Sequence, residues 1–155
     1  MKKYYLIQAF VLFVGTIVSW LAVNNDFARF YGLEGTIFKI GNCVSPNPIL
    51  TPCFYGAIGF LGAFVFSVFL LSKERIDQKI RQERYLSLLL FGGTIFGFSN
   101  FAKLCLDYFQ GSQIGCSGNP MANPFFTPCF YGSVIFLSSL LVSQFILWKE
   151  KKGYR

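Results

Sequence analysis

Four long stretches without a single charged residue constrain this chain more than any other feature of its sequence. Each is about 20 residues long, which is the length of an α-helix that crosses a hydrocarbon layer about 30 Å thick. With 54% hydrophobic and only 14% charged residues, the chain is also too apolar for an ordinary soluble domain. The sequence therefore predicts an all-α integral membrane protein, a bundle of four transmembrane helices over residues 4–23, 54–72, 85–102 and 130–148.

The first stretch also resembles a secretory signal peptide, because Lys2 and Lys3 precede an apolar segment. Its apolar run is longer than the core of such a peptide, and residues 21–24 offer no small-x-small cleavage site. The sequence Gly-Thr-Ile at 15–17 also recurs at 93–95, in the third stretch. We therefore expect the first stretch to be retained as a helix.

Positive charge gathers at one end of the predicted helices. The chain has 14 Lys and Arg against 7 Asp and Glu, and most of the basic residues lie near the two termini or in segment 73–84. The remaining loops keep only Arg29, Lys39 and Lys103. Because positive residues stay cytoplasmic during insertion, we predict a multi-pass protein with cytoplasmic N- and C-termini and extracytoplasmic cysteine loops. The net charge of +7 then reflects topology and contact with the lipid bilayer, and no nucleic-acid partner is expected.

An internal repeat divides the chain into two halves. Residues 51–56 read Thr-Pro-Cys-Phe-Tyr-Gly, and residues 127–132 repeat them. An Asn-Pro pair precedes each copy at the same distance, and further identities extend to Glu74 and Glu150. We predict a single membrane domain, residues 1–155, made of two parallel-repeated helical hairpins at about 1–75 and 82–152. Their pseudo-twofold axis would lie along the membrane normal.

Local physics accounts for much of the repeated signature. Threonine is a good N-cap and proline suits the first helical position, so each Thr-Pro is predicted to begin a helix, with threonine as its cap. The Asn-Pro just upstream predicts a turn. Aromatic rings with a polar edge favour the headgroup depth, which makes the Phe-Tyr pairs predicted interfacial anchors. These anchors are Phe54, Tyr55, Phe130 and Tyr131.

All five cysteines lie outside the predicted cytoplasmic side. Cys43 and Cys53 bracket the end of the first outer loop, Cys116 and Cys129 bracket the end of the second, and Cys105 lies near the outer end of the third helix. In an oxidising compartment the repeat favours structural disulfides Cys43–Cys53 and Cys116–Cys129, and Cys53–Cys129 is the competing pairing. Cys53 and Cys129 would also meet the positive end of a helix dipole, which makes them candidates for thiol exchange.

Four helices with both ends inside and a cysteine pair in each outer loop resemble the DsbB and vitamin K epoxide reductase families of membrane thiol oxidoreductases. Pro52-Cys53 at the start of the second helix resembles the Pro-Cys-x-x-Cys entry of DsbB. The resemblance implies electron transfer from protein thiols to a quinone. Gly56 and Gly132 stand where the second cysteine would be, so exchange would use the wider pairs Cys43/Cys53 and Cys116/Cys129.

The four stretches contain no Asp, Glu, Lys or Arg, and the chain has no histidine. Ion and proton pathways normally need an ionisable residue inside the bundle, so we expect an uncharged interior. Without histidine or a tight cysteine cluster, no metal site is expected. The mixed-charge segment 72–84 is predicted to be a solvated helical extension.

Three functions follow as hypotheses, and the sequence leaves open whether the chain is an enzyme. The first is a non-catalytic membrane protein, without cofactor, whose disulfide-tied loops bind lipid or another membrane or extracytoplasmic protein. The second is a quinone-linked thiol-disulfide oxidoreductase that uses the four loop cysteines. The third is a small transporter of an uncharged solute, formed between the hairpins.

Overall fold

The computed structural model describes residues 2–41, 43, 45–72, 76–111 and 123–153, and these residues form an all-helical fold. A single turn of 3₁₀-helix precedes the second and the fourth α-helix. Each of the four α-helices is long and apolar enough to cross a membrane, as the sequence predicts. In chain order the elements are α1 (Lys2–Glu34), η1 (Pro48–Leu50), α2 (Pro52–Ser72), α3 (Ile76–Phe109), η2 (Pro124–Phe126) and α4 (Pro128–Gly153).

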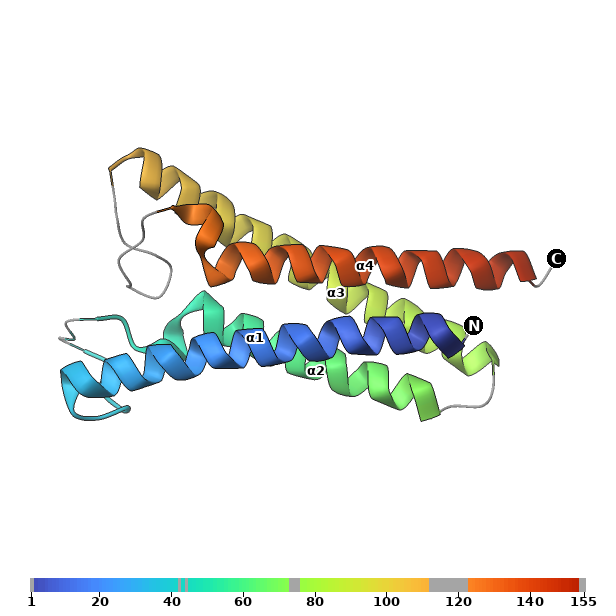
Figure 1. Ribbon diagram of the computed structural model, residues 1–155, viewed down its shortest axis with the longest axis horizontal. Helices are drawn as coiled ribbons and strands as arrows, with labels where there is room; N and C mark the ends of the chain where they lie inside the picture. Colours follow the sequence, from blue (N-terminus) through green and yellow to red (C-terminus); the bar gives the residue numbers. More distant parts are fainter. Residues whose placement is uncertain (1, 42, 44, 73–75, 112–122, 154–155) are drawn as a thin grey trace.

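The four helices form a bundle in which α1 packs mainly along α2, and α3 mainly along α4. Further contacts between α1 and α4 and between α2 and α3 join these two pairs. Both termini lie at one end of the bundle, on the right in Figure 1, and α2 and α4 begin at the other end. We call these the basic end and the cysteine end.

Glycines set where the two longest helices stop. α1 runs past its apolar stretch, through Asp26 and Arg29, and ends where Gly35 takes a φ of +69° and donates its N–H to the Tyr31 carbonyl at 2.9 Å. After α3, Gly111 has a φ of +91°. Left-handed backbone of this kind costs glycine little. α1 and α3 therefore end at or near these glycines, well beyond their apolar stretches.

The two copies of the signature fold alike. The Oδ1 atom of Asn47 accepts the backbone N–H of Ile49 at 3.0 Å and so caps η1, and Asn123 caps η2 in the same way. Helices α2 and α4 begin at the prolines, as predicted. The threonines differ from expectation, because the Thr51 hydroxyl donates to the Pro48 carbonyl at 2.7 Å and does not cap α2. Threonine thus joins the 3₁₀ turn to the α-helix, and asparagine caps the 3₁₀ turn only.

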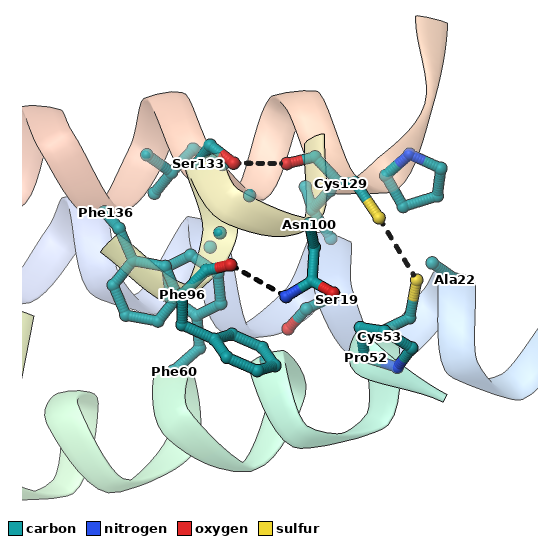
Figure 2. Close-up of a pocket in the computed structure, with 17 residues that line it drawn as sticks. Ser19, Ala22, Pro52, Cys53, Phe60, Phe96, Asn100, Cys129, Ser133 and Phe136 are labelled. Carbon is teal, nitrogen blue, oxygen red and sulfur yellow. Dashed lines mark hydrogen bonds between the residues drawn. The ribbon is translucent and has the colours of Figure 1, made fainter. Parts of the chain in front are cut away.

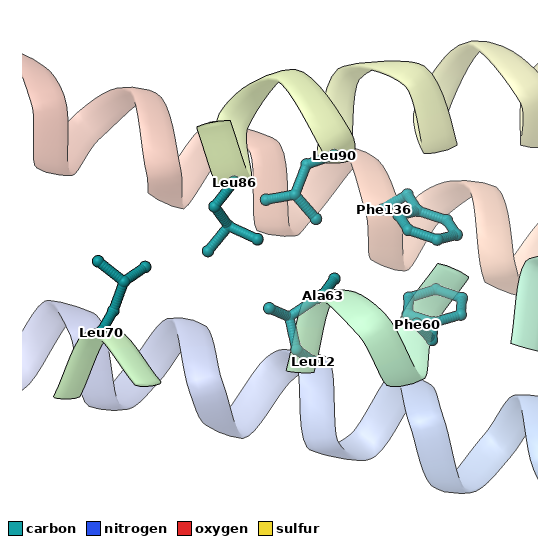
Figure 3. Packing of buried hydrophobic residues seen from close by; sticks show 7 residues of the cluster. All are labelled: Leu12, Phe60, Ala63, Leu70, Leu86, Leu90 and Phe136. Carbon is teal, nitrogen blue, oxygen red and sulfur yellow. The ribbon is translucent and has the colours of Figure 1, made fainter. Parts of the chain in front are cut away.

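An apolar cluster fills the middle of the bundle, with members from all four helices. It includes a stacked pair of rings, Phe60 and Phe136, whose centroids lie 3.8 Å apart. Figure 3 shows this pair beside Leu12, Ala63 and Leu90, with the remaining leucines further along the bundle. The cluster comprises Leu12, Phe60, Ala63, Leu70, Leu86, Leu90 and Phe136.

Two glycines make room for the stacked rings. A Cβ atom on Gly15 would lie 2.7 Å from the Phe60 ring, and one on Gly93 would lie 2.7 Å from the Phe136 ring. Neither site tolerates a side chain unless a ring moves. The small residues of α1 and α3 thus serve contacts between helices of the same chain.

Candidate functional site

The signature brings one cysteine from each half of the chain to the same place. Cys53 and Cys129 are the second residues of α2 and α4, and their Sγ atoms lie 3.8 Å apart (Figure 2). A disulfide needs an S–S distance of about 2.05 Å, so these two sulfurs are in contact but not bonded to each other. The structure thus juxtaposes the pair that the sequence offers only as the competing pairing.

The two sulfurs border a small cavity of about 60 Å³. Pro52 and Pro128, which precede the two cysteines in the chain, also line it. The Phe60–Phe136 stack closes the other side (Figure 2). All four helices contribute to its mostly apolar lining. A cavity that binds benzene measures about 150 Å³, so this one holds a few atoms and not a ring.

Three polar side chains also line the cavity, and each donates to a carbonyl of its own helix. Ser133 Oγ donates to the Cys129 carbonyl at 2.6 Å, which holds the first turn of α4. Asn100 Nδ2 donates to the Phe96 carbonyl at 2.7 Å, and Ser19 Oγ to the Thr16 carbonyl at 3.0 Å. The Oδ1 atom of Asn100 remains as an acceptor inside the cavity (Figure 2).

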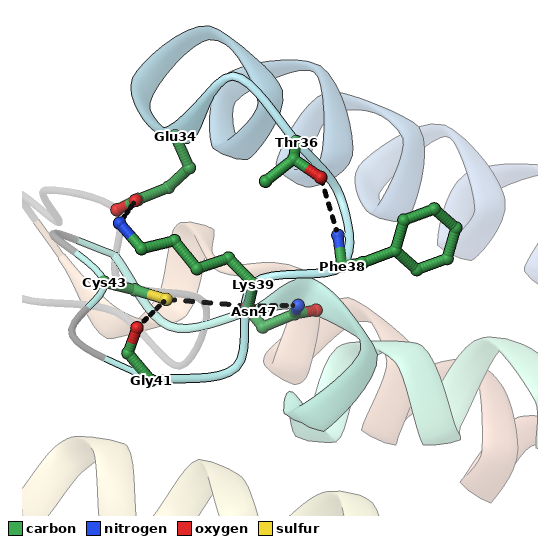
Figure 4. A network of polar contacts seen from close by, with 7 residues as sticks. All are labelled: Glu34, Thr36, Phe38, Lys39, Gly41, Cys43 and Asn47. Atoms are coloured by element: carbon green, nitrogen blue, oxygen red, sulfur yellow. Dashed lines mark hydrogen bonds and ion pairs between the residues drawn. The ribbon is translucent and has the colours of Figure 1, made fainter.

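The third described loop cysteine lies apart from this pair. Cys43 carries a thiol whose sulfur contacts the Lys39 carbonyl at 3.5 Å (Figure 4). The same loop is held by Asn47 Nδ2, which donates to the Lys39 carbonyl at 2.8 Å. The ion pair with Glu34 raises the pKa of Lys39. The structure contains no Cys43–Cys53 bond, and that pairing stays a prediction.

The other predicted site residues are distributed as follows. Cys105 is a half-buried thiol on α3, and Cys116 lies outside the described residues, so the Cys116–Cys129 pairing stays a prediction. Phe54 and Phe130 pack edge-on or tilted against rings of the neighbouring helices, whereas Tyr55 and Tyr131 point outward with 51% and 44% of their surface exposed.

A second polar cluster lies near the basic end, and the expectation of an uncharged interior is wrong there. Glu83 on α3 is fully buried and accepts hydrogen bonds from Gln8 Nε2 at 2.9 Å and from Ser143 Oγ. Glu150 on α4 is 7% exposed and accepts the Tyr5 hydroxyl at 2.8 Å. The segment that begins α3 is helical, as predicted, but Glu83 makes it only partly solvated.

Helical periodicity could have revealed this residue. The buried face of α3 recurs every three or four positions, at Leu90, Leu86 and Ser87, and Glu83 continues it by one more turn. The charge-free stretch begins at Tyr85, two residues after Glu83, so a count of charge-free residues leaves Glu83 out. Within the described segments, no group of three acidic or cysteine side chains is placed to hold a metal ion.

Comparison of the chain with models of known protein families, with curated proteins and with solved structures finds no match.

Proposed function

We propose that this chain is a multi-pass membrane protein that exchanges thiols and disulfides through Cys53 and Cys129 and passes the electrons to a quinone. The observation that carries the proposal is the 3.8 Å contact between the two sulfurs, at the border of an apolar cavity. Clamps within each loop, Cys43–Cys53 and Cys116–Cys129, would not need Cys53 and Cys129 to meet across the two hairpins. The quinone is the cofactor that the proposal requires.

Insertion in a bilayer is supported by what the helices leave on the surface. The bundle exposes large apolar side chains along all four helices, among them Leu21, Leu88 and Leu141, each at least 60% exposed. A soluble protein rarely exposes continuous apolar surface of this kind. The basic residues at the opposite end from the cysteines favour cytoplasmic termini, which puts the pair at the extracytoplasmic side.

The chemical step balances with a quinone as oxidant. When both cysteines are reduced, formation of the Cys53–Cys129 bond releases two electrons and two protons, and the quinone becomes a quinol. A thiolate of a substrate dithiol then attacks one sulfur and forms a mixed disulfide. The second substrate thiolate resolves it, which leaves the substrate oxidised and the pair reduced.

The cavity is too small to hold the quinone that would accept the electrons. Because about 60 Å³ cannot hold a quinone ring, the ring must reach the sulfurs by parting the helices around the cavity. The Oδ1 atom of Asn100 in the lining is an acceptor for the hydroxyl group of the quinol that the reaction forms. The loop cysteines Cys43 and Cys116 remain candidates for the relay to substrate.

The test is thiol trapping on the full chain in lipid nanodiscs. The protein is reduced, the reductant is removed, and a short-chain quinone is added without oxygen. We expect quinone-dependent loss of two trappable thiols in the wild type and in Cys105→Ser, and no such loss in Cys53→Ser or Cys129→Ser.

Two results would count against the proposal. If the cysteines stay oxidised and inert under mild reductant, the non-catalytic hypothesis with structural disulfides is favoured. If reoxidation by quinone persists in Cys53→Ser, another pair carries the chemistry and the proposed assignment is wrong.

A further inference from the structure

The interior near the basic end holds a carboxyl group that is only half satisfied. Within the described residues, both hydrogen bonds to Glu83 end on one oxygen, Oε1, which accepts from Gln8 and from Ser143. Within the described part of the chain, the other oxygen, Oε2, has no partner, and neither has Oε1 of Gln8. Both residues are 0% exposed, so bulk water does not reach these atoms. Two buried acceptor atoms without a hydrogen-bond donor, one on Glu83 and one on Gln8, need an explanation.

A single proton would satisfy both atoms. A carboxylic acid and a primary amide can pair through two hydrogen bonds, from the amide N–H to one carboxyl oxygen and from the carboxyl O–H to the amide oxygen. The first of these bonds is present, with 2.9 Å between Gln8 Nε2 and Glu83 Oε1. The second requires a donor that an ionised carboxylate lacks. We propose that Glu83 is a proton-binding site, with the proton on Oε2 donated to Oε1 of Gln8.

The surroundings disfavour the ionised form of Glu83. Tyr5 on α1 and Glu150 on α4 both lie close enough to interact electrostatically with Glu83. On α3, Lys79 lies over the Tyr5 ring at 5.7 Å. α2 has no ionisable side chain between Gly56 and Ser72. With two carboxyl groups near each other and no cation bonded to Glu83 in the described residues, a buried anion there would be costly.

A route for the proton leads toward the basic end. Glu150 lines a cavity of about 410 Å³ there, together with Arg81 and Arg84. Its Oε1 accepts the Tyr5 hydroxyl, and its Oε2 is without a partner among the described residues. In the other direction, Leu12, Leu90 and the stacked rings separate Glu83 from the cysteine cavity. Glu83 therefore exchanges its proton with the basic end, and this inference does not depend on the thiol chemistry.

Infrared spectroscopy reads this proton directly. The full chain, with ¹³C-labelled glutamate carboxyls, is reconstituted in phosphatidylcholine vesicles at neutral pH. The label reports on only four glutamates. We expect the C=O stretch of a protonated carboxyl group in the wild type and in Glu150→Gln, and its loss in Glu83→Gln. Absence of the band from the wild type, or its persistence in Glu83→Gln, would overturn the proposal.

The same experiment separates a proton from a metal ion. Exchange of choline chloride for sodium chloride at constant pH should leave the band unchanged. If sodium abolishes it, the oxygens of Gln8 and Glu83 bind a cation in place of the proton, and the proposal is wrong.

Stability gives a second readout that does not rely on band assignment. The native state holds a proton that the unfolded chain has already lost at neutral pH, so stability must fall as the pH rises. We expect the equilibrium constant for unfolding of the wild type to rise up to tenfold per pH unit until Glu83 ionises. Glu83→Gln, which keeps both hydrogen bonds to Gln8 and has no proton to lose, should lack this dependence. Equal slopes in the two proteins would contradict the proton site.

Discussion

The two ends of the bundle interior solve the problem of buried polar atoms in different ways. At the cysteine end, Asn100, Ser19 and Ser133 donate to carbonyls of their own helices, and the sulfurs of Cys53 and Cys129 border a small cavity. At the basic end, side chains from α1, α3 and α4 bond to one another around Glu83. The first arrangement places two sulfur atoms at the border of a cavity, whereas the second joins three helices around an ionisable group. The Phe60–Phe136 stack lies between them.

The largest effect on stability is expected from removal of one ring of the Phe60–Phe136 stack, which separates the two ends. Phe136→Ala takes away a ring that is 4% exposed and stacked on Phe60, and should lower the free energy of unfolding by about 3 kcal/mol. The value is at the low end for such a change because lipid is itself an apolar alternative for the ring. Unfolding in mixed micelles with increasing dodecyl sulfate measures it. Phe91→Ala, at a site 54% exposed, should lower the free energy of unfolding far less. Equal losses in the two variants would show that the stack contributes no special stability.

The second prediction tests whether the basic end depends on its polar pairs. Glu83→Leu leaves the Gln8 amide and the Ser143 hydroxyl buried without their acceptor, which should cost about 2–3 kcal/mol. Glu83→Gln should recover most of this loss, because its amide can accept and donate as the protonated acid does. Thiol trapping of Cys53 should be the same in both variants if the two ends are independent. A change in the trapping of Cys53 would show that the cysteine end and the basic end are coupled.

The same residues show which features of the structure can be predicted from the sequence. Charge-free stretches predict the four helices, and the repeated Thr-Pro predicts where α2 and α4 begin, because both depend on local chemistry. The contact between Cys53 and Cys129 depends on how the hairpins pack, so the sequence can offer it only as one pairing among several. The run of charges around Glu83 is typical of an exposed segment and so predicts exposure, whereas Glu83 is buried because it continues the helical face of Leu86 and Leu90.

A smaller effect is expected at the glycines that hold the rings in place. Gly93→Ala would bring a Cβ atom within 2.7 Å of the Phe136 ring, and should destabilise the protein by about 1–2 kcal/mol. Gly92→Ala is the matched control, because nothing lies within 4 Å of its added Cβ, and the helix favours alanine. Circular dichroism during thermal unfolding compares the two. If the two variants unfold at the same temperature, the close contact between Gly93 and the Phe136 ring does not limit the side chain at position 93.

The smallest effect concerns the hydroxyl that joins η1 to α2. Thr51→Val removes the bond from Thr51 Oγ1 to the Pro48 carbonyl and should cost about 1 kcal/mol. The change should also loosen the start of α2, seen as faster hydrogen exchange at Phe54 and Tyr55. Thr36→Val, in the exposed part of the loop, serves as the control. No difference between the two variants would mean that the threonine of the signature has another role.

The central claim is that Cys53 and Cys129 form one reactive pair, and it is tested most directly in a chain with no other cysteine. The variant Cys43→Ser/Cys105→Ser/Cys116→Ser is oxidised in nanodiscs with a quinone, digested without reduction and analysed by mass spectrometry. Because the two sulfurs already lie 3.8 Å apart, we predict that the peptides containing Cys53 and Cys129 are recovered linked to each other within the same chain. Recovery of both cysteines as unlinked thiols, or only as links between two chains, would contradict the account.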